Sequence, residues 1–173
     1  MALIKNTGVG IVVLAAFVAL TFGVGIVDVT AADTENTAIV MRLEGRAMLV
    51  NNANQIIRYL KQGDRLKRQD TVTVAADSRI EVRLPDDSYV RFNAGTRFTL
   101  KNLMADKRSR KRDINVNVMF GKVWATVSKL LSKNENFQIS TKTAVAGVRG
   151  TVYRLNVNED NSAVVKVYDG AVN

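Results

Sequence analysis

Alternation of apolar and polar residues dominates the chain from residue 34 onward, and helical spacing is almost absent. In residues 79–84, Ile80, Val82 and Leu84 alternate with charged neighbours, which places the apolar side chains on one face of a strand. The same pattern predicts three further strands. In the first, Phe98 and Leu100 share one face, and in the second the shared face consists of Ile114, Val116, Val118 and Phe120. In the third, Val123, Ala125 and Val127 lie on the face opposite to Lys122, Trp124 and Thr126.

Turn-forming residues separate these runs at short intervals. They occur at Glu44-Gly45, Gln62-Gly63-Asp64, Pro85-Asp86-Asp87-Ser88, residues 93–96 and Asp169-Gly170. Many short strands separated by such turns are typical of an all-β domain. We therefore predict a sandwich, a roll or a short β-solenoid, with one short helical stretch around residues 128–132.

A turn glycine followed by an apolar run recurs at Gly45, Gly121 and Gly170. The spacing between these units is irregular, so we interpret them as similar turn-to-strand units rather than as a repeat array. The last unit reaches Asn173. We expect either an edge strand at that position or a strand that continues in a longer parent protein.

The N-terminal segment differs from the rest by its apolar run. Lys5 precedes residues 8–27, which carry no charge, and acidic residues follow from Asp28 onward. This order is typical of a secretory signal peptide, and about 20 apolar residues also suffice to span a bilayer. We predict an N-terminal apolar helix within residues 1–32, a signal peptide or a membrane anchor. Residues 33–173 would form an exported domain in the periplasm or cell envelope, associated with the inner membrane where the segment is retained.

The composition argues against an enzyme. The chain has no cysteine and no histidine, which removes thiolate chemistry, the commonest general base and the commonest metal ligand. Asp86 and Asp87, and likewise Glu159 and Asp160, are interpreted as solvated turn residues rather than as a glycosidase pair. Too few oxygen ligands surround the second pair for a calcium loop. We expect no catalytic residues, no cofactor and no metal.

Positive charge is the next feature, because 25 Lys and Arg face 16 Asp and Glu, a net charge of +9. A dense basic run attracts polyanions such as anionic glycan, lipopolysaccharide or a membrane surface, although a solvated hairpin tip has the same composition. Nucleic acid is not expected, given the export signal and only 6% aromatic residues. The candidate polyanion-binding residues are Lys107, Arg108, Arg110, Lys111 and Arg112.

Trp124 is the single tryptophan of the chain. With Lys122 and Thr126 on its face it is a candidate stacking platform for a sugar ring, and a buried position under a loop is the other interpretation. Both stay open from the sequence.

Two glycines and an arginine interrupt the strand-like stretch at residues 143–154. A phosphate-binding loop would lead into a helix, whereas residues 152–157 have the pattern of a strand. We interpret the motif as a bend in which the glycines re-aim the chain and the arginine bridges across it. Its residues are Gly147, Arg149, Gly150 and Thr151.

Several of these segments together resemble the FecR domain family. They are residues 141–151, TKTAVAGVRGT, the stretches 121–127 and 137–140, Gly63-Asp64 with Leu66, the 80–89 hairpin and residues 164–172. The resemblance extends from Arg42 to Asn173. It departs from the family at Asp87, where the family usually has the glycine of an Asp-Gly turn.

The best-known members of that family are membrane-spanning periplasmic regulators that relay a ferric-siderophore signal toward a cytoplasmic sigma factor. Only residues 1–7 would be cytoplasmic in this sequence, so we do not expect direct sigma-factor control. The resemblance implies a non-enzymatic exported binding or scaffolding domain of the cell envelope, part of a signalling or regulatory relay, with an envelope protein as partner. The alternative is a basic module that binds an anionic envelope polymer.

Overall fold

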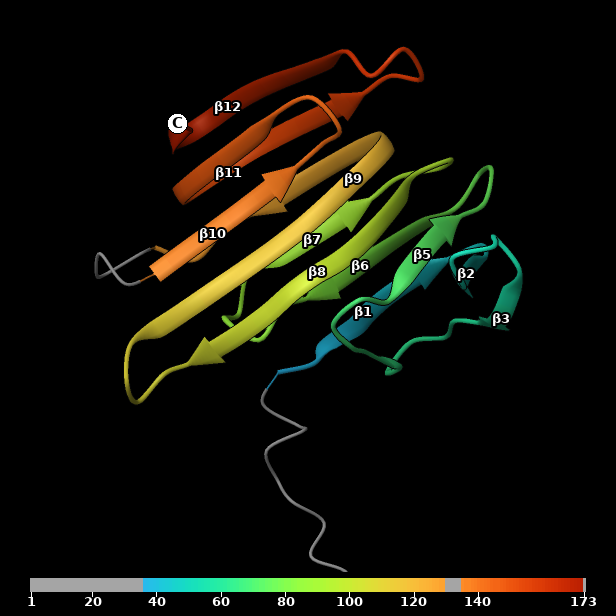
Figure 1. Ribbon diagram of the computed structural model, residues 1–173, viewed down its shortest axis with the longest axis horizontal. Coiled ribbons are helices and arrows are strands. Elements are labelled where there is room, and N and C mark those ends of the chain that lie inside the picture. The colour runs from blue at the N-terminus through green and yellow to red at the C-terminus, as the bar shows by residue number, and fades with distance from the viewer. Residues whose placement is uncertain (1–35, 130–134, 173) are drawn as a thin grey trace, which may run out of the picture.

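The computed structural model describes residues 36–129 and 135–172, with the side chains of residues 148, 149, 171 and 172 left out (Figure 1). The described residues form β-strands and connecting turns, which confirms the all-β prediction. The strands are β1 (Ala38–Glu44), β2 (Ala47–Val50), β3 (Ile56–Tyr59), β4 (Arg65–Leu66), β5 (Thr71–Val74), β6 (Arg79–Arg83), β7 (Tyr89–Phe92), β8 (Arg97–Asp106), β9 (Lys111–Thr126), β10 (Glu135–Ser140), β11 (Val145–Val157) and β12 (Ala163–Val172).

The strands form one sheet that curls into two layers. Its main path runs β3-β2-β5-β8-β9-β7-β6-β1-β4, and β10, β11 and β12 continue from β9. We call β2, β3, β5, β8, β10 and the first half of β9 the β8 layer. The β7 layer consists of β1, β4, β6, β7, β12, the second half of β9 and most of β11. Figure 1 places β3 and β12 at opposite ends of the molecule.

Strand β9 belongs to both layers and bends at Gly121. Before the bend it pairs with β8 and β10, and after it with β7 and β11. The φ angle of Gly121 is 115°, and a Cβ at this position would lie 2.5 Å from the Thr96 Cα. Only glycine fits this bend, because both the backbone conformation and the space exclude a side chain. The turn predicted at Gly121 was therefore wrong, because β9 continues through this residue.

The bend also shifts which residues face inward. Ile114 and Val118 are buried before it, whereas Val123 and Ala125 are buried after it. Phe120, which the alternation placed inward, is exposed instead. The reason is the irregular register at the bend, which turns the side chain of Phe120 away from the core.

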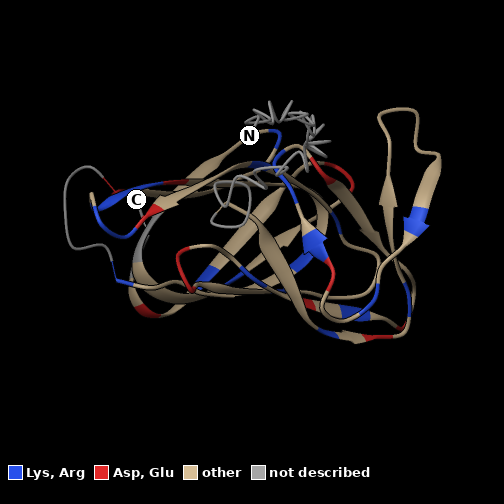
Figure 2. Cartoon of the chain, turned by 90° about the horizontal axis from the view of Figure 1, so that it is seen from below, with Lys and Arg blue, Asp and Glu red and all other residues tan. Residues whose placement is uncertain are grey.

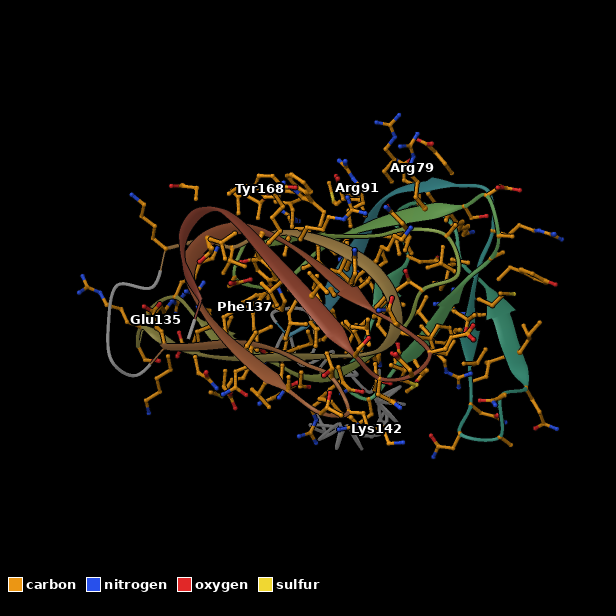
Figure 3. The ribbon with its side chains drawn as sticks, turned by 90° about the horizontal axis from the view of Figure 1, so that it is seen from above. Arg79, Arg91, Glu135, Phe137, Lys142 and Tyr168 are labelled. Carbon is orange, nitrogen blue, oxygen red and sulfur yellow. The ribbon has the colours of Figure 1, made fainter. Side chains whose placement is uncertain are left out.

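The core lies between the two layers. The rings of Phe92 on β7 and Phe98 on β8 stack at 3.6 Å between centroids, nearly parallel at 5°. Phe137 on β10 is also buried, and Figure 3 shows it between the layers. Ile80, Val82 and Leu84 are buried as the alternation predicted. Both layers therefore contribute their inward faces to one apolar core.

Other local predictions had mixed outcomes. Gly45 lies between β1 and β2, and Asp87 forms part of the predicted turn between β6 and β7. Gly170 lies within β12 rather than before a new strand, so a turn at that position was wrong. Of the predicted short helix, Ser128 and Lys129 have no regular structure, and the rest falls outside the described residues.

The predicted signal peptide or membrane anchor at residues 1–32 also lies outside the described residues. Within the described part of the chain, no helix is long and apolar enough to cross a bilayer.

Candidate functional site

The basic run forms the hairpin between β8 and β9. The Asp106 carboxylate accepts hydrogen bonds from the Ser109 hydroxyl at 2.6 Å and from the backbone N–H groups of Ser109 at 3.2 Å and Arg108 at 2.8 Å. The Ser109 hydroxyl bond is the main cause of the lowered pKa of Asp106. Lys107 donates to Asp87 at 2.6 Å. Carboxylates thus organise this hairpin and offset part of its positive charge.

Arg112 does not belong to the exposed basic surface. Its side chain is 5% exposed, and Nη1 donates to the Asp86 Oδ2 at 2.5 Å while Nη2 donates to the Ser128 carbonyl at 3.2 Å. Asp86 is 4% exposed and also accepts from the Ser88 hydroxyl at 2.6 Å. In a strand every second residue faces the same side, so the inward position of Ile114 also predicts an inward position for Arg112. The candidate polyanion site therefore loses one of its five residues.

The two acidic turns behave differently from one another. Asp86 is buried, so the expectation of a solvated pair was wrong for it, whereas Asp87 is exposed with a φ of 63°. That conformation favours glycine, which agrees with the glycine usual at this position in the family that the sequence resembles. At the other turn, Asp160 accepts from the Ser162 side chain and N–H, which lowers the pKa of Asp160. Among the described residues no three acidic side chains gather as metal ligands would.

The glycine-arginine motif lies where β11 passes between layers. Gly147 pairs with Gln138 of β10, whereas from residue 152 onward β11 pairs with the second half of β9. Gly150 has a φ of 58°, and a Cβ there would lie 2.8 Å from the Lys129 Cγ. Thr151 is buried, and its carbonyl accepts from the N–H of Val127 at 3.0 Å. The side chain of Arg149 is outside the described residues, so its bridging role stays a prediction.

Strand β12 has an unusual exposure. In the described structure it pairs with β11 alone, and its other edge is open. Val165 and Val167 lie opposite the buried Leu155 and Tyr153, on the core side of the β7 layer. They are nevertheless 40% and 41% exposed. Among the described residues, none therefore covers the core side of the layer at this edge.

Trp124 lies on the outer face of the β7 layer. It is 37% exposed, which excludes burial under a loop. Its ring lies 4.8 Å from that of Tyr168 on β12, with an angle of 32° between them. Its outward direction agrees with the alternation along β9, in which the neighbouring Val123 is buried. Tyr168 was missed, because nothing in the sequence indicates which strand lies beyond β11.

Comparison with known proteins identifies a family. A family model described as FecR protein matches residues 70–173, which confirms the family resemblance over that range. No curated protein and no solved structure matches the chain. Strands β1 and β2 precede the matched residues but pair with β6 and β5 inside them. The described strands before and within the match therefore form one structural unit.

Proposed function

The chain belongs to the FecR protein family, which is associated with signalling and regulatory relays, and on that premise we propose that it is a non-enzymatic binding domain of the cell envelope. Its ligand is an extended segment of another envelope protein, which adds a strand to the open edge of β12. This domain would be exported and would contribute binding, rather than chemistry, to a relay.

The exposure of Val165 and Val167 is the observation that carries this proposal. An open strand edge offers unpaired backbone N–H and C=O groups, and proteins usually shorten or charge such edges to prevent unwanted pairing. The edge strand β4 has two residues, whereas β12 has ten. An added strand would satisfy the backbone groups of β12 and would cover both valines with its own apolar side chains.

The alternative binding mode, attraction of an anionic polymer to the hairpin of residues 107–112, has weaker support. Arg112 is buried and Lys107 is paired with Asp87. Figure 2 shows Lys and Arg distributed over strands and loops of both layers rather than gathered at this hairpin.

The test is a pull-down with the full chain from a solubilised envelope extract, repeated across a salt series. Val165→Lys and Val167→Lys place a charge on the core side of the edge, and Val164→Lys, on the same strand but on its outer side, is the matched control. We expect one protein to stay bound at high salt to the wild type and to Val164→Lys, and to be lost from the two core-side variants. Addition of the captured protein to the purified chain should also slow hydrogen exchange of the β12 amides.

Two results would contradict the proposal. Loss of all binding at moderate salt would mean that screened surface charge holds the ligand. Equal retention by Val164→Lys and Val167→Lys would place the contact elsewhere on the domain.

A further inference from the structure

A row of side chains crosses the outer face of the β7 layer from β1 to β12. Cross-strand pairs connect its members in sequence, with neighbouring strands about 4.8 Å apart. Figure 3 shows Arg79, Arg91 and Tyr168 projecting from this same side of the molecule. The members of the row are Arg42, Glu81, Arg91, Trp124, Arg154 and Lys166.

Positive charge predominates at the β12 end of this row. Arg91 donates two hydrogen bonds to Glu81, at 2.7 and 3.2 Å, so that these two charges offset each other. Beyond Trp124, Arg154 donates to the Asn156 amide oxygen at 3.1 Å. Neither Arg154 nor Lys166 forms an ion pair with a carboxylate in the described part of the chain. Two cations next to the tryptophan are therefore available to an anionic ligand.

Aromatic surface lies beside these cations. Trp124 and Tyr168 are 37% and 47% exposed and form one contiguous pair of rings. The Lys166 Nζ lies 5.2 Å from the centroid of the Tyr168 ring, within the range of a cation–π contact. This contact holds the ammonium group beside the ring pair. A ligand resting on the rings would meet the Lys166 charge directly.

We propose that this surface, formed by Trp124, Tyr168, Arg154 and Lys166, binds an acidic glycan, an oligosaccharide with uronate carboxylates. A sugar ring has an apolar C–H face that packs on aromatic rings. Its carboxylate matches the planar fork of an arginine. The site differs from the β12 edge in both position and ligand, and it does not depend on the strand-addition proposal.

Charge distinguishes this ligand from two others. A second copy of the chain would bring the same cations against each other, in a protein of net charge +9. A single-stranded nucleic acid carries a phosphate at every nucleotide and binds in cationic grooves. Glu44 and Glu81 interrupt the cationic residues toward β1 and would repel such a backbone. A short acidic glycan needs only the two cations beside the rings.

The single tryptophan makes the test direct, because its fluorescence reports on this surface alone. The full chain is titrated with an oligogalacturonate, with a neutral oligosaccharide of the same length, with polyglutamate and with oligothymidylate. We expect saturable quenching by the oligogalacturonate, weakened by salt. The other three probes should cause little change.

Variants locate the contact, with affinity measured by calorimetry so that the tryptophan itself can be replaced. Trp124→Ala, Arg154→Gln and Lys166→Gln should each weaken oligogalacturonate binding about tenfold, the equivalent of about 1.4 kcal/mol. Arg79→Gln is the matched control, since it removes the same charge from the same face but next to Glu44. It should change the affinity less than about twofold.

Specific results would overturn the proposal. These are the absence of quenching by oligogalacturonate, equal binding of polyglutamate or oligothymidylate, and an equal effect of Arg79→Gln and Arg154→Gln. Circular dichroism of each variant confirms that it is folded. Val167→Lys, which tests the β12 edge, should retain glycan binding, so that failure of one proposal is distinguishable from failure of the other.

Discussion

Arg112 and Asp86 form an ion pair that is almost completely withdrawn from water, with Nη1 and Oδ2 2.5 Å apart. The pair joins the start of β9 to the turn between β6 and β7. Ser88 extends it, because its hydroxyl donates to Asp86 and accepts from the N–H of Ser128 at 3.0 Å. The two layers of the domain are thus fixed to each other at this end by charge as well as by apolar packing.

Asp86→Asn should be strongly destabilising, because it leaves the Arg112 guanidinium buried without its counter-charge. Removal of one partner from a buried pair typically costs about 3–5 kcal/mol. Asp87→Asn is the matched control in the adjacent position, where the exposed pair with Lys107 contributes at most about 1 kcal/mol. Urea unfolding of both variants measures the difference, and equal losses would contradict it.

A double-mutant cycle with Arg112→Met separates the pair from its surroundings. If the two charges stabilise each other, Asp86→Asn should cost far less in the Arg112→Met background than in the wild type. Additive losses would mean that Asp86 acts only through its hydrogen bonds with Ser88.

Gly121→Ala tests the bend that carries β9 from one layer to the other. The alanine Cβ would lie 2.4 Å from the Thr96 hydroxyl oxygen, whose hydrogen bonds with Lys122 stabilise the same bend. Gly63 also has a positive φ, of 87°, but open space where a Cβ would lie. Gly63→Ala should therefore cost about 1–2 kcal/mol, and Gly121→Ala about 3 kcal/mol or more. Equal unfolding midpoints for the two variants would refute the packing argument.

The sequence predicts the class of fold and many inward positions, because alternation reports directly which face of a strand is apolar. Ile80 and Val116 were placed correctly for this reason. Alternation failed at Phe120, since it assumes a straight strand and Gly121 bends this one. Arg112 lies two residues before Ile114 and so faces inward with it, although a charged residue is not normally expected in a core position.

The candidate sites could not be found without knowing which strands pair with each other. Trp124 and Tyr168 are far apart along the chain and meet because β11 brings β9 close to β12. The open edge of β12 depends likewise on which strands lie beside it. No local pattern of residues encodes such an arrangement, so the sequence alone showed Trp124 as a candidate and left its neighbours unknown.

Gly150→Val should reduce stability by about 1–3 kcal/mol, because valine is disfavoured at a φ of 58° and its Cβ would press against Lys129. Thermal unfolding measures this loss. An unchanged melting temperature would show that the bend tolerates a side chain.

Tyr153 makes stability depend on alkaline pH. Burial raises the pKa of its hydroxyl, which has no hydrogen-bond partner among the described residues. The folded chain therefore keeps this proton where the unfolded chain releases it, from about pH 10 upward. Below about pH 10 the hydroxyl is protonated in both states, and the stability of the folded chain does not change with pH through this group. Above it, the free energy of unfolding should fall by about 1.4 kcal/mol for each pH unit. Tyr153→Phe should abolish this loss and, at pH 8, unfold no more easily than the wild type. Urea unfolding at pH 8 and at pH 11 measures this effect. The control is Tyr59→Phe, which alters an exposed ring and should lose as much stability between the two pH values as the wild type. If Tyr153→Phe also loses as much stability as the wild type, the assignment to Tyr153 is wrong.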